Sequence, residues 1–276
     1  MHPTIHTIRK RHSIRTFLPR VLAQEDCQVL EQSFEEHQVG PFGAHISLSL
    51  LHFSDSDASL NRGIWTYGVI KGAKSFIVGF IEPTHQAAYD YGYCLQHVIL
   101  RATQLGLGTC WLGGTLNRSP FARVLSLPEG MYIPAVTPVG YPADSRSLMD
   151  KALCKLAGSA KRKSFDTLFF HVGGSPLRPE EAGRFAEALE CVRLAPSSSN
   201  SQPWRVVADV EAGIFHFGVK GATNKPSFKD LDIGIALSHF ELACRELSLP
   251  GSWQCLSKAP SLPEVAMYVT SWQPSS

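Results

Sequence analysis

The first residues that could do chemistry lie near the N-terminus, in the run RHSIR from Arg11 to Arg15. Its two guanidinium groups and one hydroxyl are donors that suit a phosphate dianion. From residue types alone, a solvated basic patch in front of a helix is the favoured interpretation of this run. The run is therefore a candidate phosphate site that other parts of the chain must support.

A second candidate is a loop rich in proline, serine and amides, APSSSNSQPWR from Ala195 to Arg205. The pattern predicts that a helix ends before this loop and that a strand begins at Trp204. The amides of Asn200 and Gln202 carry both donors and acceptors, so they could pair with the edge of a heterocycle. An ordinary polar loop between a helix and a strand is the alternative. We expect Trp204 itself to be a buried core residue.

Two further segments carry residue types that could contact a cofactor. The glycine-rich run Gly106–Gly114 (GLGTCWLGG) would let a flat ring approach main-chain N–H groups. It is not a G-x-G-x-x-G motif, and the run Gly68–Ser75 fails the spacing of a P-loop. The basic run Lys161–Lys163 is either a second phosphate anchor or a solvated charge run.

The elements that must position these segments occur twice in the chain. The stretch Asp90–Trp111 lies on Asp232–Trp253 at a shift of 142 positions, with eight identical residues in 22. In both copies apolar residues recur at helical spacing before a glycine or proline and then a tryptophan, which predicts a buried helix that leads into a strand. The repeated His97 and His239 lie on these helices, where we expect core histidines rather than metal ligands.

The repeat extends upstream and divides the chain into two α+β halves. Pro41 lies on Pro196 at an offset of 155. We expect half one at residues 1–155, and a linker with half two at residues 156–276. The strand signals are Ile46–His52, Ser75–Ile81, Tyr132–Gly140, Trp204–Ala208, Ile214–Phe217 and Val265–Thr270. Duplication of a homodimer would leave such a chain, which predicts an internal pseudo-dimer; two independent domains are the alternative.

Taken together, the four segments resemble the FMN-dependent nitroreductases. RHSIR is similar to that family's N-terminal R-x-S-x-R motif, and APSSSNSQPWR closely resembles its APSxxNxQPW signature. GLGTCWLGG, followed by TPVGYP at Thr137–Pro142, resembles its late helix–strand block, and KRKSFDTLFF resembles its C-terminal basic segment. The resemblance covers most of the chain and implies a nitroreductase-like α+β fold in both halves.

The order of the motifs departs from that of an ordinary nitroreductase subunit. In half one the signature slot reads GPFGAH, with His45 in place of the asparagine. Half two keeps the signature but lacks an R-x-S-x-R run, and Gln254 follows Trp253 where the family has its glycines. The resemblance therefore implies that one FMN site is kept and the other lost, as in the tandem branch of the superfamily.

The resemblance also implies roles for single residues. The FMN phosphate would be held by Arg11, Ser13 and Arg15, with Lys161 and Arg162 as second anchors and His12 near the ribityl chain. Gly113 would lie beneath flavin N5, flanked by Leu112 and Gly114. From half two, the residues that would reach the ring are Pro196, Ser197, Ser198 and Asn200. No catalytic side chain and no metal site are expected, since the cofactor carries the redox chemistry.

The implied function is an FMN-dependent NAD(P)H oxidoreductase. It would transfer a hydride through flavin N5 in a ping-pong reaction to a nitroaromatic, a quinone or a similar flat acceptor. Two alternatives stay open at this point. The chain could bind a flavin or nucleotide without turnover, or it could be a nitroreductase-fold enzyme with a different reaction.

Composition excludes several classes of protein and indicates where the chain is located. Of the 276 residues, 44% are hydrophobic, which argues against a disordered protein, and the net charge of +2 gives no signal for a nucleic-acid partner. The apolar run Phe76–Ile81 is too short to span a membrane, and the N-terminus has no apolar signal core, so we expect a cytoplasmic protein. Because an internal pseudo-dimer already buries the interface that would otherwise join two subunits, we expect the chain to be a monomer in solution.

Cysteine usage points to neither a disulfide framework nor a zinc site. The seven cysteines are an odd number and contain no C-x-x-C pair. Most of them lie in apolar stretches, where a free cysteine behaves as a small hydrophobic residue. We therefore expect most of them to be buried and inert.

Overall fold

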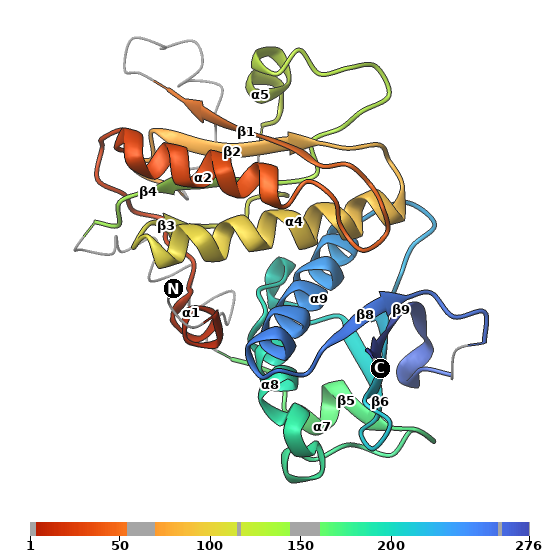
Figure 1. Cartoon of the computed structure of the whole chain (residues 1–276). Coiled ribbons are helices and arrows are strands. Elements are labelled where there is room, and N and C mark those ends of the chain that lie inside the picture. The colour runs from red at the N-terminus through yellow and green to blue at the C-terminus, as the bar shows by residue number, and fades with distance from the viewer. Residues whose placement is uncertain (1–3, 54–69, 115–116, 144–160, 259–260, 276) are drawn as a thin grey trace. The chain divides into compact units, whose positions relative to one another are not determined.

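The computed structural model describes residues 4–53, 70–114, 117–143, 161–258 and 261–275 (Figure 1). The chain forms two compact units: unit 1 comprises Met1–Arg9 with Ser159–Ser276, and unit 2 comprises Lys10–Gly158. The expected first half, 1–155, is corrected at its N-terminal end, because its first nine residues belong to unit 1. Arg9 forms an ion pair with Glu187 there, and the Ile5 N–H donates to Glu246 at 3.0 Å.

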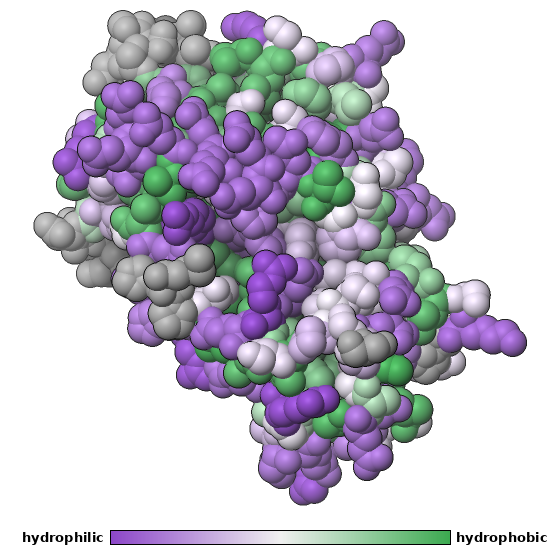
Figure 2. Space-filling view, in the orientation of Figure 1, coloured by the Kyte–Doolittle hydropathy of each residue, from purple (hydrophilic) through white to green (hydrophobic). Residues whose placement is uncertain are grey.

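Unit 2 is built around one antiparallel sheet and two long helices. Its strands are β1 (Ser47–His52), β2 (Ser75–Phe80), β3 (Gly108–Thr109) and β4 (Val136–Gly140), in the order β1-β2-β4-β3. Its helices are α2 (Gln24–Glu36), α4 (His85–Gln104) and α5 (Ser119–Val124). Helix α2 packs on α4 and β1. The outer face of α2 is hydrophilic (Figure 2), and only three of its residues are buried.

Unit 1 carries a five-stranded sheet in the order β5-β6-β7-β9-β8. The strands are β5 (Phe169–His171), β6 (Trp204–Asp209), β7 (Ile214–Lys220), β8 (Gly251–Gln254) and β9 (Ala266–Pro274). The helices are α1 (Thr4–Lys10), α7 (Phe165–Leu168), α8 (Ala186–Leu194) and α9 (Phe228–Glu246). Short 3-10 turns are η1 (Pro179–Glu181), η2 (Gly183–Phe185), η3 (Ser198–Asn200) and η4 (Pro263–Val265). Helix α9 packs on α8, β6 and β7.

The two sheets share one topology, so the repeat in the sequence is also a repeat in the fold. The order β1-β2-β4-β3 of unit 2 matches β6-β7-β9-β8 of unit 1, with α4 and α9 at the same place between the second and third strands in the chain. β5 has no counterpart among the described strands of unit 2; it pairs parallel to β6 and was not expected from the sequence. All six expected strands are present within a few residues. The strand expected from Tyr132 begins at Val136 because Pro134 has no N–H to donate.

The repeated helices α4 and α9 are largely buried, as their apolar patterns predict. Trp204 is fully buried, which confirms it as a core residue. The buried His239 ring donates from Nδ1 to the Cys191 carbonyl at 2.8 Å, and the His97 ring lies 4.4 Å from that of His37. In the described part of the chain no group of side chains could hold a metal ion.

The described cysteines behave as the sequence predicts. Cys94, Cys110, Cys191 and Cys244 are buried and free, whereas Cys27 is partly exposed and Cys255 exposed. Burial raises the pKa of the Cys191 thiol to about 12, so it is un-ionised at neutral pH. Cys154 lies outside the described residues. Among the described helices, none combines the length and apolar character needed to cross a membrane.

Candidate functional site

The basic run near the N-terminus is an extended arm that pairs with the sheet edge of unit 2. The Ile14 N–H donates to the Thr109 carbonyl on β3 at 2.8 Å. Two further backbone bonds, Lys71 N–H to Arg15 carbonyl at 2.8 Å and Phe17 N–H to Lys71 carbonyl at 2.9 Å, continue the pairing. The backbone of the arm is therefore fixed independently of its side chains.

The close approach of Ile14 to Gly108 orients the arm. A Cβ atom on Gly108 would lie 2.7 Å from the Ile14 Cβ, so only glycine admits this contact. Because successive residues of an extended chain face opposite sides, Ser13 and Arg15 face away from Gly108. With Arg11, which is also partly buried, they form a donor set that fits a phosphate. His12 is exposed, and its Nδ1 donates to the Lys10 carbonyl at 3.1 Å.

The glycine-rich segment is held by an arginine that the sequence analysis missed. Arg118 donates to the carbonyls of Gly113 at 2.9 Å, Ile133 at 2.7 Å and Pro134 at 3.0 Å. The buried Leu112 exchanges both backbone bonds with Val136, at 2.8 and 2.9 Å. Within the described residues nothing accepts the Gly113 N–H, which fits the donor role that the resemblance implies. Gly114 is exposed. The signal in the sequence that could have identified Arg118 is its position, four residues after the glycine pair.

The signature loop of unit 1 has a strained backbone. Ser199, Asn200 and Gln202 have φ of +50°, +54° and +46°, a region that side-chain-bearing residues rarely adopt. Strain of this kind costs about 1–3 kcal/mol per residue and is concentrated at functional sites. The Gln202 N–H donates to the Ser197 hydroxyl at 2.9 Å and closes the loop. Pro196 and Ser197 are partly buried, while Ser198 is exposed.

The basic segment 161–163 braces this loop within unit 1. Asn200 donates from Nδ2 to the Lys161 carbonyl at 2.6 Å and accepts from Arg162 at 2.7 Å. The Lys163 N–H donates to the Gln202 side chain at 2.8 Å, and its ammonium donates to the Ser201 carbonyl at 2.8 Å. The segment is thus not a simple solvated charge run, and the exposed Lys161 side chain is left as a candidate second anchor.

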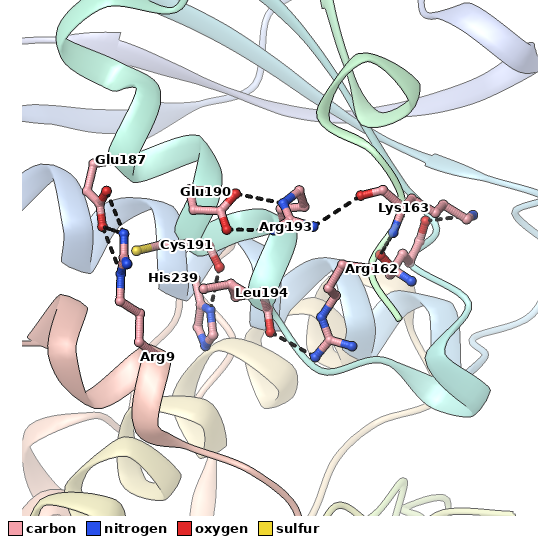
Figure 3. Close-up of polar contacts among 10 residues, drawn as sticks. Arg9, Arg162, Lys163, Glu187, Glu190, Cys191, Arg193, Leu194 and His239 are labelled. Atoms are coloured by element: carbon pink, nitrogen blue, oxygen red, sulfur yellow. Dashed lines mark hydrogen bonds and ion pairs between the residues drawn. The ribbon is translucent and has the colours of Figure 1, made fainter. Parts of the chain in front are cut away.

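Helix α8 in turn holds the basic segment. Arg193 bonds to Glu190 at 2.6 and 2.7 Å and donates to the Lys163 carbonyl at 3.3 Å, and Arg162 donates to the Leu194 carbonyl at 3.2 Å (Figure 3). Burial, reinforced by Arg193, lowers the pKa of Arg162. Arg162 therefore already has two acceptors in its own unit, and the loop, the segment and the end of α8 form one hydrogen-bonded block.

A buried arginine fixes the other end of the loop. Arg205 on β6 donates from Nη1 to the carbonyls of Gln202 at 3.2 Å and Trp204 at 2.6 Å. Its Nε donates to Glu264 at 2.5 Å, and Lys220 lies 3.2 Å from the same carboxylate. The side chain of Arg205 is only 2% exposed, so Glu264 is the carboxylate that compensates its buried charge.

Two buried aspartates hold corresponding loops in the two units. Asp232 on α9 accepts from the Ser198 N–H at 2.8 Å and the Ser201 hydroxyl at 3.4 Å. Asp90 on α4, its counterpart in the repeat, accepts from the N–H groups of Phe42 at 3.0 Å and Ala44 at 2.8 Å. The sequence showed these aspartates as an identical pair, yet the contacts that explain the identity are tertiary.

Comparison with known proteins identifies the family. The chain matches the family model described as "Putative TM nitroreductase" over residues 3–244. The chain belongs to this family. A structure titled a "putative nitroreductase" from Thermotoga maritima aligns with 99% of this chain and 95% of its own length, at 20% identity and a TM-score of 0.62. This match confirms the nitroreductase fold and the tandem two-half architecture that the sequence predicted.

Shorter nitroreductases align with about half of the chain. Nitroreductase A of Vibrio parahaemolyticus is 22% identical and covers 54% of this chain and 71% of its own, with a TM-score of 0.44. A Desulfovibrio desulfuricans protein, solved "in complex with fmn", is 20% identical and covers 55% of this chain and 95% of its own, with a TM-score of 0.42. No curated protein matches the chain.

The pH dependence of this nitroreductase's stability follows from the two aspartates. Burial raises the pKa of Asp232 to about 7 and that of Asp90 to about 6, although hydrogen bonds to their loops oppose the shift. Near Asp232, the charge of Asp230 adds to the shift and that of Lys229 opposes it. The folded state therefore holds protons that the unfolded chain has released, and stability is lost as pH rises from about 4 to about 7.

We expect Asp232→Asn to remove the contribution of Asp232 to this dependence. The stability of the variant relative to wild type should rise between pH 4 and pH 8, because the asparagine does not titrate. Urea unfolding of both proteins across this range measures the difference. A difference that is flat with pH would contradict the raised pKa.

Proposed function

We propose that this chain is an FMN-dependent NAD(P)H oxidoreductase of the nitroreductase type. The observation that carries the proposal is the arm of unit 2, whose backbone is pinned to β3 so that Ser13 and Arg15 share one face. Family membership and the motif set support the same reading. Bound FMN would supply the redox chemistry, taking a hydride from NAD(P)H at N5 and passing it to a nitroaromatic, a quinone or a similar flat acceptor.

In unit 2, the residues of this chain bind and orient the cofactor. Arg11, Ser13 and Arg15 would hold the phosphate through charge-assisted hydrogen bonds, with His12 near the ribityl chain. The Gly113 N–H would serve as a donor to flavin N5, with Leu112 and Gly114 at its sides. The Gly113 carbonyl is fixed by Arg118, so the segment keeps its orientation without cofactor.

In unit 1, we propose that the signature loop contacts the flavin through four residues, Pro196, Ser197, Ser198 and Asn200. We also propose Lys161 and Arg162 as second anchors for the FMN phosphate. Because Arg162 already bonds to Asn200 and Leu194, its contribution to the cofactor comes mainly through the loop that it braces. No side chain of the chain is proposed to transfer a proton or to act as nucleophile.

The test begins with the purified full-length protein. An absorbance scan and mass spectrometry detect bound flavin, and titration with FMN measures binding if none copurifies. NADH and NADPH consumption with menadione or nitrofurazone then tests turnover. Absence of FMN binding would overturn the proposal, whereas flavin binding without consumption of either nicotinamide would leave a flavin-binding protein without turnover.

We also propose that the chain is a monomer in solution. Its repeated topology places two copies of one sheet-and-helix unit in a single chain. Light scattering after size exclusion should therefore give the mass of one chain, 30.3 kDa. A mass twice as large at micromolar concentration would contradict the proposed monomer.

A further inference from the structure

The two loops held by the buried aspartates differ in backbone strain. In residues 40–45 of unit 2 the residue with positive φ is Gly43, at +83°, where glycine bears no penalty. In residues 197–202 of unit 1 the positive φ values fall on three residues with side chains, Ser199, Asn200 and Gln202. A buried aspartate thus secures a relaxed loop in one unit and a strained loop in the other, through two backbone N–H groups at Asp90 and through one backbone N–H and one hydroxyl at Asp232.

A strained loop persists only where surrounding contacts over-determine its conformation. Asp232 provides such contacts. Its side chain is buried, at 3% exposure, and lies on the long helix α9. One of its oxygens accepts the Ser198 N–H at the start of η3, and the other accepts the Ser201 hydroxyl just after η3. The carboxylate therefore spans the turn that contains Ser199 and Asn200.

We propose that Asp232 is a positioning residue for cofactor binding. Its carboxylate holds η3 in the strained conformation in which Ser198 and Asn200 meet FMN. This inference rests on the proposed function. It assigns Asp232 a role that Asp90, its counterpart in the repeat, does not have, because the loop of unit 2 has lost the signature asparagine and carries His45 instead.

The two bonds of Asp232 predict how substitutions should rank. Asp232→Ala releases both donors, so the loop can relax away from its left-handed conformation. Asp232→Asn can keep both, because its amide oxygen accepts the Ser198 N–H while its NH₂ group donates to the Ser201 hydroxyl. Asp90→Ala, the matched control, also removes two hydrogen bonds to a buried aspartate, here from two backbone N–H groups, at a loop that is not proposed to touch the cofactor.

FMN dissociation constants of the full-length proteins, measured by quenching of flavin fluorescence, test the ranking. We expect Asp232→Ala to bind FMN at least about tenfold more weakly, since the substitution removes both hydrogen bonds that hold η3. Asp232→Asn should stay close to wild type, and Asp90→Ala should leave FMN affinity unchanged. If Asp232→Ala does not fold, the same measurement is made on Asp232→Ser. The serine side chain is polar but too short to reach the loop.

Hydrogen exchange without FMN gives a second readout. In Asp232→Ala, peptides that cover residues 196–203 should exchange faster than in wild type, while in Asp90→Ala the increase should be confined to residues 40–45. Unchanged exchange of residues 196–203 would show that Asp232 does not hold the loop.

The outcomes separate this inference from the function on which it rests. If wild type binds FMN and Asp232→Ala binds it equally well, the positioning role is wrong and the proposed function stands. If Asp90→Ala weakens FMN as much as Asp232→Ala, the effect is general stability and the inference is again overturned. If wild type binds no FMN, the proposed function fails and the inference fails with it.

Discussion

Replacing both Arg11 and Arg15 by alanine is expected to weaken FMN binding by at least about a hundredfold. Each hydrogen bond to a charged partner contributes about 1.5–3 kcal/mol, and about 1.4 kcal/mol corresponds to a tenfold change in affinity. The fold should survive, because the backbone bonds of Ile14, Arg15 and Phe17 hold the arm and alanine leaves them in place. Titration of FMN into the purified double variant measures the loss.

Two controls sharpen this test. The double substitution Arg11→Lys with Arg15→Lys keeps the charge but loses the planar fork, so its FMN affinity should fall between wild type and the alanine variant. Arg123→Ala removes one exposed arginine of α5 and should leave FMN affinity unchanged. Equal affinity of wild type and the double alanine variant would place the phosphate elsewhere on the chain.

Glu264→Ala is expected to lower the free energy of unfolding by about 3 kcal/mol. Removal of one partner of a buried ion pair leaves the other charge uncompensated, which costs about 3–5 kcal/mol. The low end applies because Glu264 is 37% exposed, while Arg205 is 2% exposed. Urea unfolding followed by tryptophan fluorescence measures the change.

Lys220→Ala is the matched control for Glu264→Ala. Lys220 contacts the same carboxylate at 3.2 Å, but its side chain is 49% exposed, so its ion pair should contribute at most about 1 kcal/mol. Burial raises the pKa of Glu264, and the hydrogen bonds from Arg205 and Lys220 outweigh this and bring the pKa below its ordinary value. A loss in Glu264→Ala no larger than that in Lys220→Ala would show that Arg205 does not depend on Glu264.

Local patterns were enough to predict much of the fold. Strands such as Ser75–Phe80 and Trp204–Asp209 follow from alternating or continuous apolar runs bounded by turn residues, and their limits shifted by only a residue or two. The repeat was visible because both copies bury the same kind of helix, which restricts the residue types along it. β5 escaped prediction because its three residues, Phe169–His171, join α7 directly, with no turn residue between them.

The candidate site was only partly visible in the sequence. The arm, the glycine-rich run and the signature loop stood out through residue type and spacing. Arg118, Asp232 and Glu264 did not, because each acts on main-chain atoms or on a partner that lies far away in the sequence. A role of that kind leaves little local pattern; the hints were the repeated aspartate and an arginine four residues after the glycine pair.

By itself, the sequence determined the two α+β halves, the family that they resemble and the segments that could bind a cofactor. These features depend on periodicity and on short motifs, which neighbouring residues encode. Only the tertiary structure showed that residues 4–9 pack with unit 1 and that Asn200 is bonded to the basic segment. It alone showed that Asp232 spans a strained turn. Hydrogen bonds between distant residues form only when the chain has folded, so their partners cannot be read from spacing.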